Sequence, residues 1–176
     1  MPPVDTDTPL SSAATGQSEF DRFLLLLGRL NYSWTNTESL LIHLIAGLSK
    51  TDKETAVVIF LTLNTTRARI GLVERLSKLP RISQMEREAV LGITRAVQQL
   101  SGLRNQYNHC IYSFDTKSGD LSTIRMRVAD RKNQIKVGEM TALDSKTIDG
   151  IESSLVDLAK LNTEVWALIK TYGYPA

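Results

Sequence analysis

Cysteine and histidine are scarce in this chain of 176 residues, and their scarcity excludes several kinds of site. The single cysteine, Cys110, rules out an internal disulfide and a cysteine-based metal cluster. The two histidines, His43 and His109, lie far apart and form no zinc-binding pattern. A glycine-rich phosphate loop is also missing. The sequence therefore predicts no metal ion and no cofactor, and a lone cysteine fits a reducing, cytoplasmic location.

Long apolar runs are absent as well. The longest, such as residues 56–61, are far too short to span a bilayer, so we expect no membrane association. Residues 1–17 are rich in Pro, Ser, Thr and Asp and lack the basic and apolar regions of a secretory signal. We expect this stretch to be a disordered or loosely ordered arm, followed by one domain at residues 18–176.

The chain as a whole has little excess of charge, because its formal net charge is +2. The charge is unevenly distributed, however. Residues 51–136 hold fifteen Lys and Arg against eight Asp and Glu, a net charge of +7, and the flanking segments hold six against eleven, a net charge of −5. A basic middle segment suits a nucleic-acid partner, and solvated helix faces explain the same excess equally well.

Apolar residues recur at three- and four-residue steps through most of the chain, which predicts a mainly α-helical fold. The first helix is expected over residues 18–48, as one long helix in which the weak helix formers of residues 31–38 allow a kink or a break. A second helix is expected over residues 51–79. Thr51 and Glu54 have the spacing of a capping box and are expected to start it.

A third helix begins with a second capping box, formed by Ser83 and Glu86, and continues to the segment around residue 104. Turn residues and alternating apolar and polar residues then predict a small antiparallel hairpin or meander at about residues 111–138. The last helix begins near Asp144 or Ser145. The expected architecture is an up-and-down bundle of four to five helices, with a small β-hairpin inserted before the last helix.

The end of the third helix carries the residues best suited to chemistry. Arg104 can hold a phosphate through its planar fork of donors, and His109 can move a proton near neutral pH. Asn105 follows the arginine directly. Together an arginine and a histidine suffice, in principle, to cleave RNA without a metal ion.

Arg104, Asn105 and His109, with four residues between Arg and His, resemble the signature of the HEPN superfamily of small helical domains. The run from Cys110 to Asp115 is similar to the aromatic segment that follows the His in many members, with Cys110 where Gly often stands. This resemblance implies a HEPN-like bundle and, in the ribonucleases of the superfamily, a homodimer with its active sites at the two-fold axis.

Helix geometry also favours a dimer. On a straight helix Arg104 and His109 lie about 140° apart, so one copy is poorly arranged to hold a phosphate between them. Two copies facing across a two-fold axis can each supply the group that the other lacks. His109 would act as general base on the ribose 2′-hydroxyl or as general acid on the leaving 5′-oxygen. Arg104 would stabilise the transition state, and Asn105 would orient the imidazole or the phosphate.

Four further residues are candidates for contacts with RNA. Tyr107 and Tyr112 could stack on bases, although each fits a packing role at least as well. Arg125 and Arg127 would share one face of the expected strand and could contact phosphates.

Structural roles are the expected ones for the remaining candidate residues. His43 lies among apolar residues and is expected in the core, and Cys110 is expected to be a small packed thiol. Arg67, Arg69 and Arg75 are either an RNA-binding track or a solvated helix face, of which the solvated face is the more common outcome.

Two functions of different classes follow from these residues. The first is a HEPN-like, metal-independent endoribonuclease that acts as a toxin or as a defence or stress effector. Its candidate partners are an antitoxin and a nucleotidyltransferase. The second is a non-catalytic, dimeric module that binds RNA, a nucleotide or a protein, in which Arg104 and His109 are buried or far from an open groove. A structural bundle with a decayed motif is a third, weaker alternative.

Overall fold

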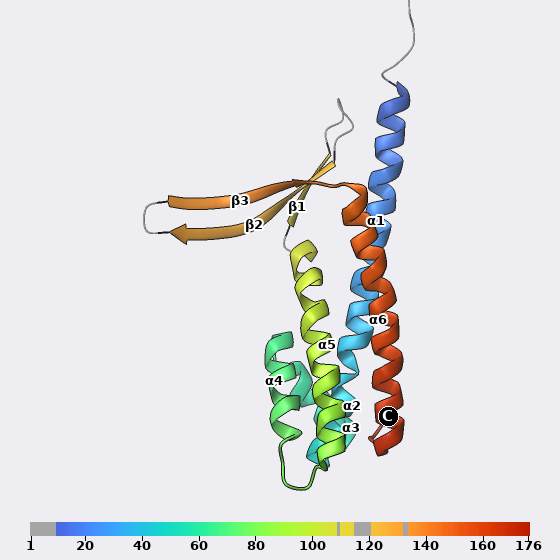
Figure 1. Ribbon diagram of the computed structural model, residues 1–176, viewed down its shortest axis with the longest axis vertical. Coiled ribbons are helices and arrows are strands. Elements are labelled where there is room, and N and C mark those ends of the chain that lie inside the picture. The colour runs from blue at the N-terminus through green and yellow to red at the C-terminus, as the bar shows by residue number, and fades with distance from the viewer. Residues whose placement is uncertain (1–9, 109, 115–120, 132–133) are drawn as a thin grey trace, which may run out of the picture. The chain divides into compact units, whose positions relative to one another are not determined.

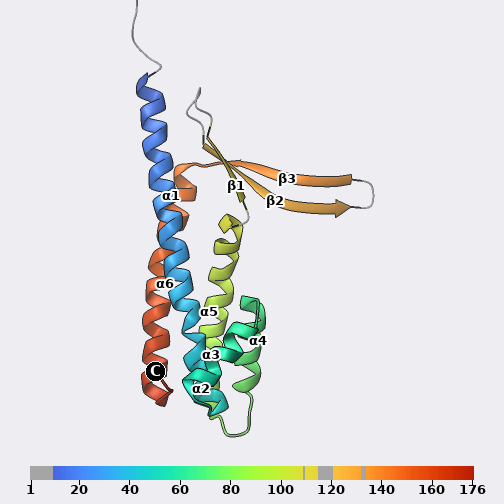
Figure 2. The ribbon, with the colours of Figure 1, turned by 180° about the vertical axis from the view of Figure 1, so that it is seen from behind.

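The computed structural model describes residues 10–108, 110–114, 121–131 and 134–176. Within them the chain is mainly helical, with a small antiparallel sheet inserted before the last helix, as the sequence predicts (Figures 1 and 2). No helix in this part of the chain is both long and apolar enough to cross a membrane. The elements, in chain order, are α1 (Leu10–Ser39), α2 (Leu41–Ser49), α3 (Lys53–Thr62), α4 (Thr66–Leu76), α5 (Gln84–Asn108), β1 (Cys110–Phe114), β2 (Leu121–Arg131), β3 (Gln134–Ala142) and α6 (Ser145–Tyr172).

The helix expected over residues 18–48 is interrupted at Leu40, which separates α1 from α2. The backbone N–H groups of Leu40 and His43 donate to carbonyls only three residues earlier, at 3.2 and 3.1 Å, which makes a tighter turn than the four-residue step of an α-helix. Residues 31–38 remain helical, so the polar residues there do not break the helix. At its other end α1 begins at Leu10, inside the stretch expected to be a loose arm, and residues 1–9 lie outside the described residues.

The helix expected over residues 51–79 is two helices, α3 and α4, because the polar residues before Thr65 favour caps and turns over a helix interior. Thr51 is not the N-cap of α3. Asp52 takes that position, and its carboxylate accepts a hydrogen bond of 2.7 Å from the backbone N–H of Thr55, which lowers the pKa of Asp52. The side chain of Thr65 caps α4 in the same way.

The start of α5 and the start of α6 agree with the sequence. The Ser83 hydroxyl accepts a hydrogen bond of 3.2 Å from the backbone N–H of Glu86. The Asp144 carboxylate accepts one of 2.9 Å from the backbone N–H of Thr147, so α6 begins where expected. Side-chain caps of this kind satisfy N–H groups that have no partner inside the helix.

The chain forms two compact units. Unit 1 comprises Met1–Arg29 and Gln106–Glu152, and unit 2 comprises Leu30–Asn105 and Ser153–Ala176. The helices α1, α5 and α6 contribute residues to both.

Unit 2 is a helical bundle around an aliphatic core that includes one tryptophan. In both views α4 runs beside α5 (Figures 1 and 2), and the Thr94 hydroxyl of α5 lies 3.3 Å from the Glu74 carboxylate of α4. The deeply buried side chains of this core include Trp34, Leu41, Leu44, Ile45, Leu48, Val73, Val90, Val97, Leu158 and Val165.

The sheet of unit 1 is a three-stranded antiparallel meander in the order β1-β2-β3, rather than a two-stranded hairpin (Figure 1). Along β2 and β3, Arg125 pairs with Glu139 and Val128 pairs with Val137, so the register shifts between these pairs. The shift places a bulge in the interval that contains Arg127, and a bulge interrupts the alternation of side chains along a strand. Strand alternation alone therefore does not assign Arg125 and Arg127 to one face.

Candidate functional site

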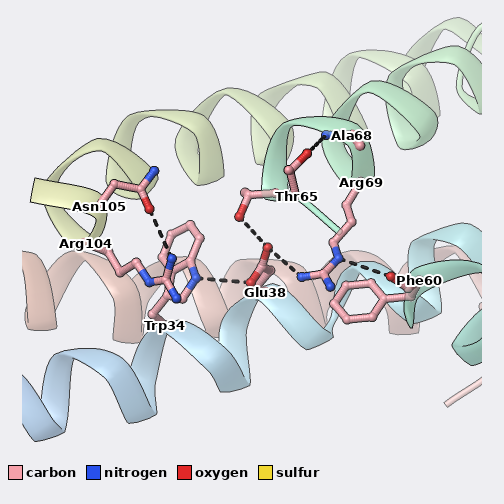
Figure 3. Close-up of polar contacts among 9 residues, drawn as sticks. Trp34, Glu38, Phe60, Thr65, Ala68, Arg69, Arg104 and Asn105 are labelled. Carbon is pink, nitrogen blue, oxygen red and sulfur yellow. Dashed lines mark hydrogen bonds and ion pairs between the residues drawn. The ribbon is translucent and has the colours of Figure 1, made fainter. Parts of the chain in front are cut away.

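The candidate site begins with Arg104 and Asn105, four and three residues before α5 ends at Asn108. Arg104 follows the buried Val97 by seven residues, which is two helical turns, so it lies on the side of α5 that faces the bundle. Figure 3 shows Arg104 reaching from α5 toward α1, on the side where Trp34 lies. Arg104 is half-buried, whereas Asn105 is exposed.

The two motif residues contact each other. The Nη1 atom of Arg104 donates a hydrogen bond of 3.1 Å to the Oδ1 atom of Asn105 (Figure 3). Because Oδ1 of Asn105 accepts this bond, its Nδ2 amide group can donate to another acceptor. A half-buried guanidinium beside an amide donor is suited to binding an anion, since partial exclusion of water strengthens the attraction between opposite charges.

His109 lies outside the described residues, between the end of α5 at Asn108 and the start of β1 at Cys110. Because α5 ends at Asn108, the angle of about 140° expected between Arg104 and His109 on a straight helix stays a prediction. The side chains of Arg125 and Arg127 also lie outside what the structure describes, although both residues belong to β2.

The two candidate tyrosines are both packed around Phe23 in unit 1. Tyr107 is only 5% exposed, and its ring meets the ring of Phe23 edge-on, with centroids 6.3 Å apart. The rings of Tyr112 and Phe23 also meet edge-on, with centroids 5.4 Å apart. The Tyr112 hydroxyl donates a hydrogen bond to the backbone carbonyl of Tyr107. Burial, with smaller effects of Cys110 and Tyr107, raises the pKa of Tyr112 to about 12. Of the two roles considered for Tyr107, packing is the one that it has, because its ring is too buried to stack on a base.

Cys110 is half-buried, and its thiol donates a hydrogen bond of 2.8 Å to the carbonyl of Gln106. This is the arrangement of a packed thiol.

Among the three candidate arginines of α4, Arg69 has its guanidinium group engaged in contacts inside the bundle, and the sequence did not reveal these contacts. Its Nη1 atom lies 3.1 Å from the Glu38 carboxylate, its Nε donates to the carbonyl of Phe60 at 3.2 Å, and its guanidinium lies 3.9 Å from the centre of the Phe60 ring (Figure 3). Glu38 also accepts hydrogen bonds from Nε1 of Trp34, at 3.1 Å, and from the hydroxyl of Thr66, at 2.6 Å. Arg69 therefore holds α1, α3 and α4 together.

The two other arginines of α4, Arg67 and Arg75, are exposed and line a groove between α4 and α5. The same helix thus carries one arginine with a structural role and two that face solvent.

His43 is a core residue, as expected. It is 7% exposed, its Nδ1 lies 2.6 Å from the carbonyl oxygen of Pro175, and its ring lies 5.2 Å from that of Trp166. The neighbouring Tyr174 is buried too, and its hydroxyl donates to the carboxylate of Glu86 at 2.6 Å. Burial and this hydrogen bond raise the pKa of Tyr174 above its ordinary value.

Comparisons with protein-family models, with curated proteins and with solved structures find no match to this chain. A function for this chain therefore has to follow from its own residues. Among the described ones, no group of three or more His, Cys, Asp and Glu side chains could hold a metal ion. What they do provide is a half-buried cation and an amide donor at the end of α5, and two exposed cations on α4.

Proposed function

We propose that this protein is a HEPN-like, metal-independent endoribonuclease that acts in the cytoplasm as a homodimer, in the role of a toxin or of a defence or stress effector. The observation that supports this most is the pair formed by Arg104 and Asn105. Both lie within two turns of the end of α5, in contact with each other, and His109 is the next residue in the sequence after α5.

In this proposal His109 moves protons, as base on the 2′-hydroxyl or as acid on the 5′-oxygen, and Arg104 stabilises the charge on the phosphorus-centred transition state. Asn105 binds Arg104 through its Oδ1 atom and uses its Nδ2 group to orient the phosphate or the imidazole. The products are a 2′,3′-cyclic phosphate and a 5′-hydroxyl.

The first test is RNA cleavage by the purified protein in EDTA, beside the variants His109→Ala and Gln99→Ala. Removal of a general acid or base lowers such a rate by about 10²- to 10⁴-fold, so His109→Ala should be nearly inactive. Gln99→Ala, which changes an exposed residue of the same helix, should cleave like the parent. Equal cleavage by parent and His109→Ala would mean that another site or a contaminant is responsible, and the assignment of the motif would fall.

The dimeric arrangement has a test of its own. If each active site combines Arg104 of one copy with His109 of the other, mixed dimers of Arg104→Ala and His109→Ala contain one intact site. Remixing the two inactive variants should then restore roughly a quarter of the parent activity. Half of the dimers are then mixed, and in each mixed dimer one of the two active sites keeps both Arg104 and His109. No recovery in dimers shown to exchange would contradict a shared site.

A second function, a non-catalytic binding module, is favoured by the burial of Tyr107 and by the internal hydrogen bond of Tyr112. With both aromatic rings engaged in packing, the motif lacks these two residues as base-stacking platforms. In that case the dimer should bind RNA, a nucleotide, or a protein such as an antitoxin or a nucleotidyltransferase without cleaving RNA. Binding by a folded dimer that cleaves none of a varied set of RNAs would favour this alternative.

A further inference from the structure

A groove with basic side chains runs between α4 and α5 in unit 2. Its lining includes the side chains of Arg67 and Arg75 from α4 and of Gln98 from α5. Arg67 and Arg75 are eight residues apart on one helix, a rise of about 12 Å.

The guanidinium groups of Arg67 and Arg75 are available to a ligand. Among the described residues, neither side chain forms a hydrogen bond or an ion pair. Most of the arginines around them do: Arg69 binds Glu38 and Phe60, Arg81 donates to the carbonyl of Leu48 at 2.6 Å, and Arg87 donates to the carbonyl of Ser77 at 3.0 Å. The groove thus exposes the two cations of α4 that the fold itself does not use.

Gly71 leaves room for the Arg75 side chain to lie between the two positions on α4. It lies one turn after Arg67 and one turn before Arg75, and it lines the groove. The Nη1 atom of Arg75 lies 3.7 Å from the position that a Cβ atom on Gly71 would occupy, so the Arg75 side chain folds back over the glycine toward Arg67. Any larger side chain at this position would occupy part of the floor between the two guanidinium groups.

The groove leads toward the motif along one face of α5. Asn105 follows Gln98 by seven residues, which is two turns, so both lie on the same face with about 10 Å between them along the helix axis. Gly102 lies between them on that face, is exposed, and has no atom within 4 Å of a Cβ position. Figure 3 shows the last turns of α5, with Asn105, and the first turn of α4, with Ala68 and the preceding N-cap residue Thr65. An extended polynucleotide chain lying in the groove could therefore continue along α5 to Asn105 without crossing a bulky side chain on this face.

We infer that the groove between α4 and α5 binds the sugar-phosphate backbone of single-stranded RNA and guides it to Arg104 and Asn105. The inference rests on the proposed function, since it names the substrate track of the same site. Arginine forks match phosphate oxygens, and the N-terminal turn of α4, which has no acidic residue, adds a partial positive charge near Arg67.

One acidic residue of the groove sharpens the inference. Glu74 is half-buried in the lining, and its carboxylate accepts a hydrogen bond from the Thr94 hydroxyl. A carboxylate repels a phosphate, whereas the amide of Glu74→Gln keeps an oxygen for Thr94 and removes the charge. Opposite effects are therefore expected from Glu74→Gln, which should tighten binding, and from changes at Arg67 and Arg75, which should weaken it.

The test measures binding of a fluorescently labelled, unstructured single-stranded RNA in EDTA, in the His109→Ala background so that no cleavage occurs. The double change Arg67→Gln and Arg75→Gln should weaken binding on the order of 25-fold at 0.1 M salt. The slope of log affinity against log salt should fall by about 1.4, at about 0.7 for each phosphate that the variant no longer neutralises. Glu74→Gln should tighten binding, and circular dichroism should show that all variants remain folded.

The matched control is Lys160→Gln with Lys170→Gln, which removes the same charge from exposed positions on α6. This pair should leave the affinity nearly unchanged. The inference is overturned if the two pairs weaken binding equally, if the arginine pair has no effect, or if neither parent nor variant binds RNA. It is also overturned if polyglutamate of equal charge competes as well as RNA.

Failure of the groove and failure of the ribonuclease are distinguishable. If the parent cleaves RNA and the arginine pair changes neither KM nor kcat, the groove is wrong and the ribonuclease stands. If the parent binds RNA through Arg67 and Arg75 but does not cleave it, the groove stands and the ribonuclease is wrong.

Discussion

Arg69 and Arg67 lie two residues apart on α4, yet they differ in every contact. Arg69 is largely buried, pairs with Glu38 and stacks on Phe60, whereas Arg67 is exposed and binds nothing among the described residues. The difference shows how one short helix divides its cations between two tasks. A cation whose donors are satisfied inside the bundle contributes to folding, and one whose donors face a groove remains available to an anion.

The largest expected effect on stability comes from Arg69→Gln. It leaves the Glu38 carboxylate buried without its cation, and the side chains of the pair are only 17% and 11% exposed. Loss of one partner of a buried ion pair costs about 3–5 kcal/mol, because the remaining charge is uncompensated. We expect the free energy of unfolding in urea to fall by that amount.

Arg67→Gln is the matched control, since it makes the same change two residues away on the same helix. Its free energy of unfolding should stay within about 0.5 kcal/mol of the parent. If Arg69→Gln were as mild as Arg67→Gln, the buried network around Glu38 would not stabilise unit 2, and the contrast between the two arginines would disappear.

A smaller effect is expected where Tyr174 packs against α2. A Cβ atom on Gly47 would lie 2.2 Å from the ring of Tyr174, so Gly47→Ala must displace that ring. Overpacking of this kind costs about 1–3 kcal/mol. Gly92→Ala is the control, because a Cβ there meets no atom within 4 Å, and it should instead stabilise α5 by up to about 1 kcal/mol.

Thermal unfolding of the two glycine variants compares an occupied helix face with an open one. Opposite shifts in Tm are the expected result. Equal shifts of the same sign would mean that Tyr174 does not pack on Gly47 in solution.

The smallest effect concerns Tyr112 at alkaline pH. Its pKa is raised to about 12 by burial, whereas an unfolded chain ionises tyrosine near pH 10. The unfolded state therefore releases this proton first, so the contribution of Tyr112 to stability is complete below about pH 10 and is lost as the pH rises toward 12. Tyr112→Phe should remove that part of the alkaline loss of stability.

The measurement is the ultraviolet absorbance of tyrosinate during a pH titration of the folded protein. The parent should show one more late-ionising tyrosine than Tyr112→Phe, which keeps Tyr174. Identical titration curves would mean that the ring of Tyr112 is solvated, and that it remains available to stack on a base.

Much of the secondary structure could be predicted from local patterns. Apolar periodicity located the helices, and the capping residues Ser83 and Asp144 located the starts of α5 and α6. The patterns failed at Leu40 and at the polar residues before Thr65, where long periodic stretches divide into two helices each. Periodicity continues across such a break, because both halves bury one face, and so it does not reveal where the axis changes.

The candidate site could be predicted in part. The spacing of Arg104, Asn105 and His109 singled out the motif, but the packing of Tyr107 around Phe23 had no local signal. From the sequence, Arg67, Arg69 and Arg75 formed one group of candidates. In the structure Arg69 is engaged inside the bundle, whereas Arg67 and Arg75 are exposed.

The sequence by itself determined the mainly helical fold, the small antiparallel insertion and the position of the motif, because these depend on residues near one another in the chain. Only the tertiary structure decided which polar groups are used inside the protein. Glu38 meets Thr66 across 28 residues, and Tyr174 meets Glu86 across 88. A helical period specifies which face is buried but not which partner covers it, so contacts of this range follow only from how the helices pack.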